Sequence, residues 1–322
     1  MAKFIYILKR LGAMLLTLIV IYVMSFVLIK LLPVEKSIGQ GNAARIEEAR
    51  REALGYNKPI MEQLWIYTKN ILTKWDWGTS WKIDYMADVG DVITSRLPPT
   101  MLINVYSLLF SVPVGILLGI FAAIKKNKWQ DQLISVMIML FISVPSYVYA
   151  FLVQYILGFK AGWFPLVTSS LYDAGNSWFS WTMFHSMVLP VLSLSFGDIA
   201  GLARFTRAEL TEQLSSDYML LARTKGLTRS QATVRHALKN AMVPILPSII
   251  SMFVGVIGGS IIIEQIFGVP GIGALFLKSI NLKDYDVFMA SSMFYTVIGL
   301  AANILIDLSY GFLDPRIRMG ER

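Results

Sequence analysis

Long apolar runs are the feature of this sequence that most limits how it can fold. A helix needs about 20 apolar residues to cross the hydrocarbon core of a bilayer, at a rise of about 1.5 Å per residue. Runs of that kind recur along the chain and are separated by charged segments instead of being mixed with them. We therefore predict an all-α integral membrane protein with six transmembrane helices. They are expected near residues 11–32, 101–124, 133–157, 186–203, 241–267 and 287–312.

The composition supports a membrane protein and excludes several kinds of site. The chain has 322 residues, of which 55% are hydrophobic, and its mean hydropathy is +0.58. Cysteine is absent, which excludes disulfides, thiolate metal sites and a cysteine nucleophile. His185 and His236 are the only histidines, so a histidine-based metal or catalytic site is not expected.

The Lys and Arg residues predict the orientation, because basic connecting segments stay on the cytoplasmic side. One alternating set of segments carries sixteen Lys or Arg against six Asp or Glu, and the other set carries twelve of each. We therefore predict that the N and C termini are cytoplasmic. This distribution also explains the net charge of +8 without nucleic acid. The basic set is 1–10, 125–132, 204–240 and 313–322, and the balanced set is 33–100, 158–185 and 268–286.

These predictions divide the chain into three parts. Residues 1–32 form the N-terminus and the first transmembrane helix, and residues 33–100 form an extracytoplasmic insertion. Residues 101–322 form a core with five transmembrane helices. Within the insertion we predict one helix that ends at Gly55, where glycine accepts a left-handed conformation, and a second over residues 60–73.

The chain lacks the motifs of an ATPase or a hydrolase. No G-x-x-x-x-G-K-[S/T] phosphate loop is present, and no serine lies in a G-x-S-x-G turn. We therefore expect no ATP site of that kind and no catalytic residue in this chain.

The predicted cytoplasmic segment 204–240 contains two helix patterns instead of a short polar loop. Ser216 and Asp217 can cap a first helix over about residues 218–225 by accepting backbone N–H groups. Gly226 follows as a stop signal. We expect the apolar face of this helix to consist of Tyr218, Leu221 and Ala222.

A second helix follows at once. Thr228 and Gln231 fit a capping box, and the apolar positions after them continue into the next span. Two roles are open for the first helix. It could lie in the lipid headgroups as an interfacial helix, or it could insert into a partner protein and transmit the motion of that partner to the spans.

The residues of this segment resemble a known family. The pattern Asp217-Tyr218-x-x-x-Ala222-Arg223-x-Lys225-Gly226-Leu227, followed by Arg235-His236-Ala237-Leu238-Lys239-Asn240-Ala241 and Pro244, is similar to the coupling loop of ABC importer permeases. It is most similar to the first permease subunit of oligopeptide and dipeptide importers. The general permease motif has Glu-Ala-Ala where this chain has Leu220-Leu221-Ala222, a departure usual in the peptide branch.

Further motifs of the family occur in order along the chain. They lie in the predicted insertion, at the ends of the predicted spans and at the C-terminus. They include Leu54-Gly55-Tyr56, Asp76-Trp77-Gly78-Thr79-Ser80, Arg96-Leu97-Pro98-Pro99-Thr100, Ser143-Val144-Pro145-Ser146, Asp284-Tyr285 and Asp314-Pro315-Arg316.

The resemblance implies a type I ABC importer permease fold and a set of partners. These are a second homologous permease, two ATPase subunits that bind ATP and Mg²⁺, an extracellular or lipid-anchored peptide-binding protein, and membrane lipid. This chain itself would carry no cofactor. The residues implied in coupling to the ATPases are Asp217, Tyr218, Leu221, Ala222, Arg223, Lys225, Gly226 and Leu227.

Two other groups of residues are candidates for function. Asp198, Glu264 and Asp307 are acids within predicted spans, where a charge is costly, so each either touches the translocation pathway or pairs structurally with neighbouring helices. Trp75, Trp77 and Trp81 either contact the binding protein or anchor the chain at the membrane interface.

The sequence does not determine which cargo the importer would carry. It could be an oligopeptide or dipeptide, or a nickel chelate, an opine or a short glycan. A membrane protein without a transport role is the remaining alternative.

Overall fold

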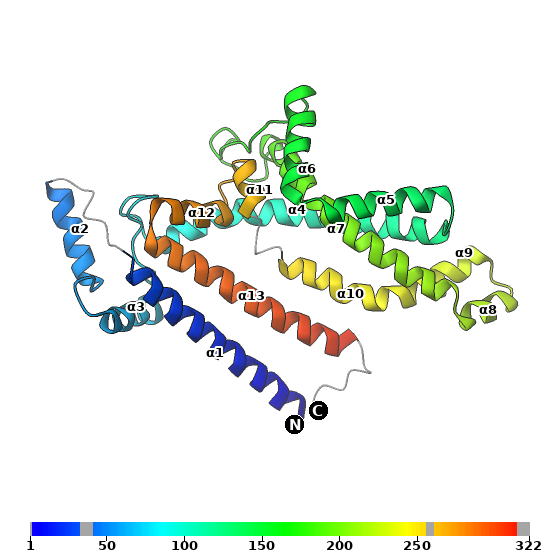
Figure 1. The fold of residues 1–322 in the computed structure, drawn as a ribbon, viewed down its shortest axis with the longest axis horizontal. Coiled ribbons are helices and arrows are strands. Elements are labelled where there is room, and N and C mark those ends of the chain that lie inside the picture. The colour runs from blue at the N-terminus through cyan, green and yellow to red at the C-terminus, as the bar shows by residue number, and fades with distance from the viewer. Residues whose placement is uncertain (1, 33–40, 256–260, 314–322) are drawn as a thin grey trace. The chain divides into compact units, whose positions relative to one another are not determined.

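A computed structural model describes residues 2–32, 41–255 and 261–313, and the described residues are helical, without a β-strand (Figure 1). One isolated antiparallel bridge joins Thr79 and Asp88. The helices are α1 (Ala2–Lys30), α2 (Asn42–Ala53), α3 (Ile60–Lys74), α4 (Val89–Ile124), α5 (Trp129–Ser143), α6 (Ser146–Val153), the π-helix η1 (Gln154–Lys160), α7 (Trp181–Leu214), α8 (Asp217–Thr224), α9 (Arg229–Ala232), the π-helix η2 (Thr233–Ala237), α10 (Leu238–Gly255), α11 (Ile261–Ile266), α12 (Ile272–Leu282) and α13 (Tyr285–Leu313).

Four of the described helices are long and apolar enough to cross a membrane. They lie in α1, α4, α7 and α13 and correspond to the first, second, fourth and sixth predicted spans. Two of them are longer than predicted. The second begins at Val89, inside the segment assigned to the insertion, and the fourth continues to Leu214, inside the predicted coupling loop.

The third predicted span is broken. Two shorter helical segments, Trp129–Ser143 and Ser146–Lys160, are long and apolar enough for a span only when they are taken together. The chain bends by 106° between them. Val144 has an extended backbone, as expected for a residue that precedes proline. Pro145 then opens α6, so the chain changes direction sharply at this proline.

The fifth predicted span, residues 241–267, is described only in part. Its described portions are α10 and α11, and residues 256–260 lie outside the described residues. Pro244 and Pro247 both lie inside α10. The described residues therefore contain four candidate spans, or five when the bent pair counts as one.

The chain divides into two compact units. One comprises Met1–Pro98 and Pro270–Ala301, and the other comprises Pro99–Val269 and Ala302–Arg322. The division falls within α4 between Pro98 and Pro99, two residues that lack the N–H group of a regular helix.

In the first unit, two buried aspartates at the start of α13 hold the loop that follows α3. Asp284 accepts hydrogen bonds from the Ser80 hydroxyl at 2.7 Å and from the backbone N–H groups of Trp81, Lys82 and Ile83 at 3.3, 3.0 and 3.0 Å. Because Asp284 is fully buried, these donors replace the water that its carboxylate has lost.

Asp286 makes a second attachment in this unit. Its carboxylate accepts hydrogen bonds from the Tyr56 hydroxyl at 2.9 and 3.0 Å and from the Thr79 backbone N–H at 3.2 Å. Burial and the Asp286 charge raise the pKa of Tyr56 well above its usual value, so the hydroxyl stays protonated and donates. The insertion is thus fastened to α13 through buried hydrogen bonds.

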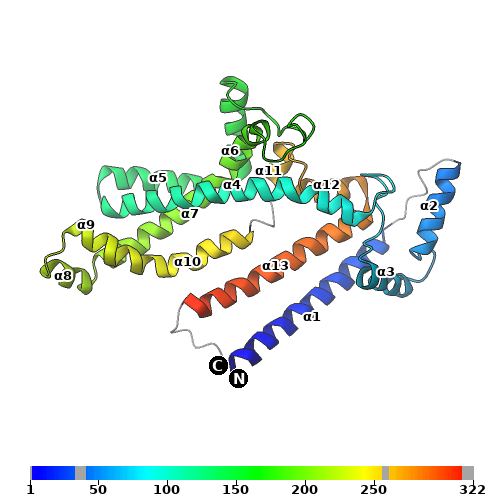
Figure 2. The same ribbon diagram turned by 180° about the vertical axis from the view of Figure 1, so that it is seen from behind.

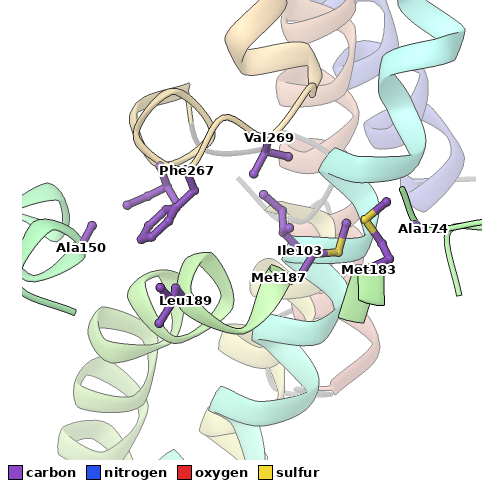
Figure 3. Close-up of a cluster of buried hydrophobic side chains, with 9 residues drawn as sticks. Ile103, Ala150, Ala174, Met183, Met187, Leu189, Phe267 and Val269 are labelled. Carbon is purple, nitrogen blue, oxygen red and sulfur yellow. The ribbon is translucent and has the colours of Figure 1, made fainter. Parts of the chain in front are cut away.

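The core of the second unit lies where α4, α6, α7 and the segment around α11 meet (Figure 3). Ile103, Met187 and Phe267 belong to this cluster and are fully buried. Elsewhere in the unit α4 and α7 approach closely at a glycine, since a Cβ atom at Gly119 would lie 2.5 Å from the Cβ atom of Thr206. Small residues permit such close packing of membrane helices.

Candidate functional site

The helix α8 forms the centre of the candidate site, and its limits match the predicted helix within one residue. Ser216 is the N-cap residue, but its side chain donates to the carbonyl of Gln213 at 2.6 Å and accepts no N–H group. The predicted side-chain cap is therefore wrong. Asp217 is the first residue of the helix, where a negative charge interacts favourably with the helix dipole.

The buried face of α8 differs from the prediction by one residue. Met219 and Ala222 are buried, with exposed fractions of 4% and 5%, and Tyr218 packs against the same cluster. Leu221, which was expected on this face, is instead exposed. Met219 takes its place because the neighbouring helices cover the side of α8 that carries positions 219 and 222.

The cluster under α8 joins several elements. It includes Ala123 at the end of α4, Leu210 on α7, Ala232 on α9 and Ala241 on α10. Figures 1 and 2 show α8 and α9 at the end of α7 and beside the start of α10. The helix α8 therefore packs, through this cluster, against three helices of the same unit, α4, α7 and α10.

The outer face of α8 combines apolar and basic side chains. Leu220 and Leu221 are 62% and 55% exposed, and Arg223 and Lys225 are also exposed. Two adjacent exposed leucines on a short, well-packed helix could bury their side chains in an apolar groove of another protein or in the apolar part of a membrane.

The turn after α8 has the geometry that the sequence predicts. Gly226 has φ +91°, a conformation that L-residues with a Cβ atom rarely adopt. The capping box is also confirmed, with Thr228 Oγ1 accepting from the Gln231 N–H and Gln231 Oε1 accepting from the Thr228 N–H. From there α9, η2 and α10 follow one another without a gap.

An ion pair near this site, in which only the carboxylate is buried, was not predicted. Arg207 on α7 donates two hydrogen bonds to Asp131 on α5, one of them 2.8 Å long from Nη2 to Oδ2. The Asp131 side chain is only 3% exposed and also accepts from the Asn127 N–H at 2.9 Å. Both residues lay in segments read as cytoplasmic loops, and the sequence offered no signal that would pair them.

The three intramembrane acids have different surroundings. Asp198 lies on α7 with an exposed side chain, whereas Glu264 on α11 is fully buried and accepts from the Thr100 hydroxyl at 2.8 Å. Asp307 lies within α13, and its side chain is outside the described residues. In the described part of the chain, no three His, Asp or Glu side chains form a group that could hold a metal ion.

The three tryptophans do not form one exposed surface. Trp75 is 70% exposed at the C-terminal end of α3, and Trp77 is partly buried beside it, with ring centroids 5.6 Å apart. Trp81 is 5% exposed and lies under the guanidinium of Arg51 at 5.0 Å. Trp81 therefore packs inside the insertion.

Several described helices are long and apolar enough to span a membrane, which indicates a polytopic membrane protein. Comparison with known proteins identifies its class. The chain belongs to the family of binding-protein-dependent transport system inner membrane components, whose model matches residues 115–319, and the model of the N-terminal region of such components matches residues 1–103. It is thus a multi-pass protein of the cytoplasmic membrane, and its family consists of ABC transporter permeases, which are non-catalytic subunits.

Curated relatives match nearly the whole chain. The dipeptide transport system permease protein DppB of Lactococcus lactis is 36% identical over 98% of this chain and 99% of its own length. The glutathione transport system permease protein GsiC of Escherichia coli is 32% identical over 97% of this chain and 98% of its own length. The crystal structure of an amino acid ABC transporter aligns with 68% of this chain and 92% of its own, at 19% identity and a TM-score of 0.48.

Proposed function

We propose that this chain is the first permease subunit of an ABC importer that carries oligopeptides or dipeptides into the cell. The observation that carries this proposal is the match of 36% identity, over almost the full length of both chains, to a permease named for dipeptide transport. The relative named for glutathione transport supports a cargo of the same chemical kind, because glutathione is itself a peptide.

The proposal includes the partners that such an importer needs. A second permease completes the pathway, two ATPase subunits bind ATP and Mg²⁺, and an external binding protein delivers the peptide. We assign α8, with Asp217, Arg223, Lys225, Gly226 and Leu227 around it, to contact with an ATPase subunit. Closure of the ATPases would move α8, and its packing against α4, α7 and α10 would carry that motion into the spans.

The proposed topology has six spans and cytoplasmic ends. The charge distribution supports this orientation. The bent pair α5–α6 would supply the third span, and α10 with α11 would supply the fifth. Residues 33–100 would then lie outside the cell, with the start of α4 belonging both to this insertion and to the second span.

Among the intramembrane acids, we assign Asp198 to the translocation pathway. Its side chain is exposed on α7, a helix that is long and apolar enough to span a membrane. A carboxylate in that position needs water, a partner chain or a cationic cargo group beside it. Glu264 is buried and accepts from the Thr100 hydroxyl, which favours a structural role. Asp307 remains a second candidate for the pathway.

Peptide uptake by the purified complex tests the cargo. Proteoliposomes with both permeases and both ATPase subunits, supplied with the binding protein, should accumulate labelled dipeptide or oligopeptide only when ATP is present. Nickel chelates, opines and short glycans serve as competing cargoes in the same assay. Accumulation of one of these without accumulation of any peptide would refute the peptide assignment.

The coupling role of α8 has its own test. Gly226→Pro should abolish ATP-dependent uptake, because proline fixes φ near −65° and the native φ is +91°. Arg223→Glu should also reduce uptake by reversing the charge of the exposed face. The amount of each variant in the membrane should stay normal. Normal uptake by both variants would show that this turn does not couple the subunits.

A further inference from the structure

The helix α3, in the insertion, carries an exposed apolar stripe that the transport role does not explain. Met61, Trp65 and Leu72 are 68%, 68% and 79% exposed. At about 100° per residue these three positions lie within about 40° of one another around the helix. Trp75, at the C-terminal cap of α3, extends the stripe. We call these four residues the α3 stripe.

The contacts between α3 and α1 fix the depth of the stripe. The Tyr22 hydroxyl lies 2.8 Å from the Thr68 hydroxyl, and the Phe26 and Tyr67 ring centroids are 5.4 Å apart. Tyr22 and Phe26 precede Lys30, the last residue of α1, by about 12 Å and about 6 Å along the helix axis. Both residues belong to the candidate span Leu8–Lys30. The middle of α3 therefore lies beside the membrane-spanning part of α1 (Figure 1).

The rest of the insertion begins at the end of this span. The Lys30 ammonium lies 3.6 Å from the ring centroid of Tyr56, a residue between α2 and α3. The α2 sequence, NAARIEEARREA, is strongly polar. Polar α2 thus belongs to the part of the insertion outside the bilayer, whereas amphipathic α3 lies one to two helical turns deeper along α1.

The remaining sides of α3 agree with this placement. Tyr67 packs against α1 and α13 in the core of the unit. Gln63, on the side of the helix opposite the stripe, donates to the carbonyl of Lys58 at 2.7 Å in the polar loop before α3. Glu62 and Lys69 are exposed along one edge. The α3 stripe therefore faces away from the polar loop.

We propose that α3 is an interfacial helix whose stripe inserts into the lipid of the leaflet next to Lys30. In the topology proposed above this is the outer leaflet, but the lipid contact does not depend on that orientation. Tryptophan is enriched at the membrane interface, and an apolar face bordered by charged side chains is typical of helices that lie in it. The depth along α1 favours lipid over a soluble binding protein, because a soluble protein would have to enter the bilayer to reach the stripe.

The absence of cysteine from the chain permits a direct test. Leu72→Cys places a label on the stripe, and Thr73→Cys places one on an exposed position about 100° away around the same helix. Each variant is labelled with bimane and assembled into the complete transporter in nanodiscs, with cysteines of the partner subunits replaced. Bimane emission is quenched separately with phosphatidylcholine that carries a nitroxide at carbon 5 of an acyl chain, and with aqueous iodide. Nanodiscs expose both leaflets, so the result does not depend on the topology.

We expect lipid quenching at position 72 to exceed that at position 73 by about twofold or more, with the order reversed for iodide. Addition of the binding protein should change neither value at position 72. Iodide quenching at position 72 that the binding protein abolishes would overturn the proposal and make the stripe a docking surface. Protection of position 72 from both quenchers would also overturn it, since the stripe would then be covered by protein. Trp65→Cys provides a second position on the stripe, and peptide uptake confirms that each variant is assembled.

Discussion

Replacement of the two exposed leucines of α8 by serine should weaken binding of the ATPase subunits without loosening the permease. Leu220 and Leu221 are 62% and 55% exposed in the isolated chain, so they contribute little to its packing. The neighbouring Met219 and Ala222 hold α8 in place. The double variant Leu220→Ser, Leu221→Ser therefore separates docking from folding.

The size of the effect follows from the exposed fractions. Full burial of a leucine side chain contributes about 1.5–3 kcal/mol. Scaled by the exposed fractions, burial of both residues in a partner groove contributes about 2–3.5 kcal/mol. At 1.4 kcal/mol for each factor of ten, the variant should bind the ATPase subunits about 20- to 300-fold more weakly.

The assay titrates purified ATPase subunits onto the two permeases in nanodiscs and measures the apparent Kd, together with the thermal unfolding midpoint of the permeases. Tyr172→Ser is a suitable control, because Tyr172 is 83% exposed in the segment between η1 and α7, away from α8. An unchanged Kd for the leucine variant would refute the reasoning. A fall in the unfolding midpoint would show that the leucines stabilise the fold instead.

Three further substitutions test the packing that surrounds the site. Gly119→Ala should lower the thermal unfolding midpoint, with a loss of about 1–3 kcal/mol from overpacking between α4 and α7. Gly201→Ala, with nothing within 4 Å of its Cβ position, should instead raise the midpoint slightly, because alanine favours a helix interior over glycine. Arg207→Ala should lower the free energy of unfolding by about 1–3 kcal/mol, because the buried Asp131 carboxylate loses its cationic partner. Asp131→Asn in the same background should recover part of that loss in the same unfolding measurement. Asp284→Ala should leave buried N–H groups unpaired at about 1–3 kcal/mol each, so limited proteolysis should cleave residues 79–88 faster than in the parent chain. Unchanged midpoints, or an unchanged cleavage rate, would count against the corresponding contact.

Local signals in the sequence predicted the turn and the second helix start of segment 204–240. Gly226 and the Thr228–Gln231 capping box each depend on only a few neighbouring residues, and both occur as expected. Which residues of α8 are buried depends on distant helices. The sequence therefore could not distinguish Met219 from Leu221, which lie on different sides of the same short helix.

The limits of the spans were harder to predict than their existence. The second span was predicted to begin near residue 101, yet α4 begins at Val89 and continues through Pro98 and Pro99. Hydropathy predicted a single, unbroken helix for the third span, because apolar content does not report the direction of the chain. The structure has two helical segments there, with a bend of 106° between them. The position of the α3 stripe relative to the membrane also could not be predicted from the sequence, because it follows from contacts of α3 with Tyr22 and Phe26 of α1.

The most direct test of the central claim is affinity purification of this chain from a mild detergent extract, with identification of the accompanying proteins by mass spectrometry. A permease coupled to motor subunits through α8 should bring with it a second multi-pass permease and two ATPase subunits. Recovery of folded chain alone, under conditions that preserve other membrane complexes, would contradict the importer assignment and the coupling role of α8.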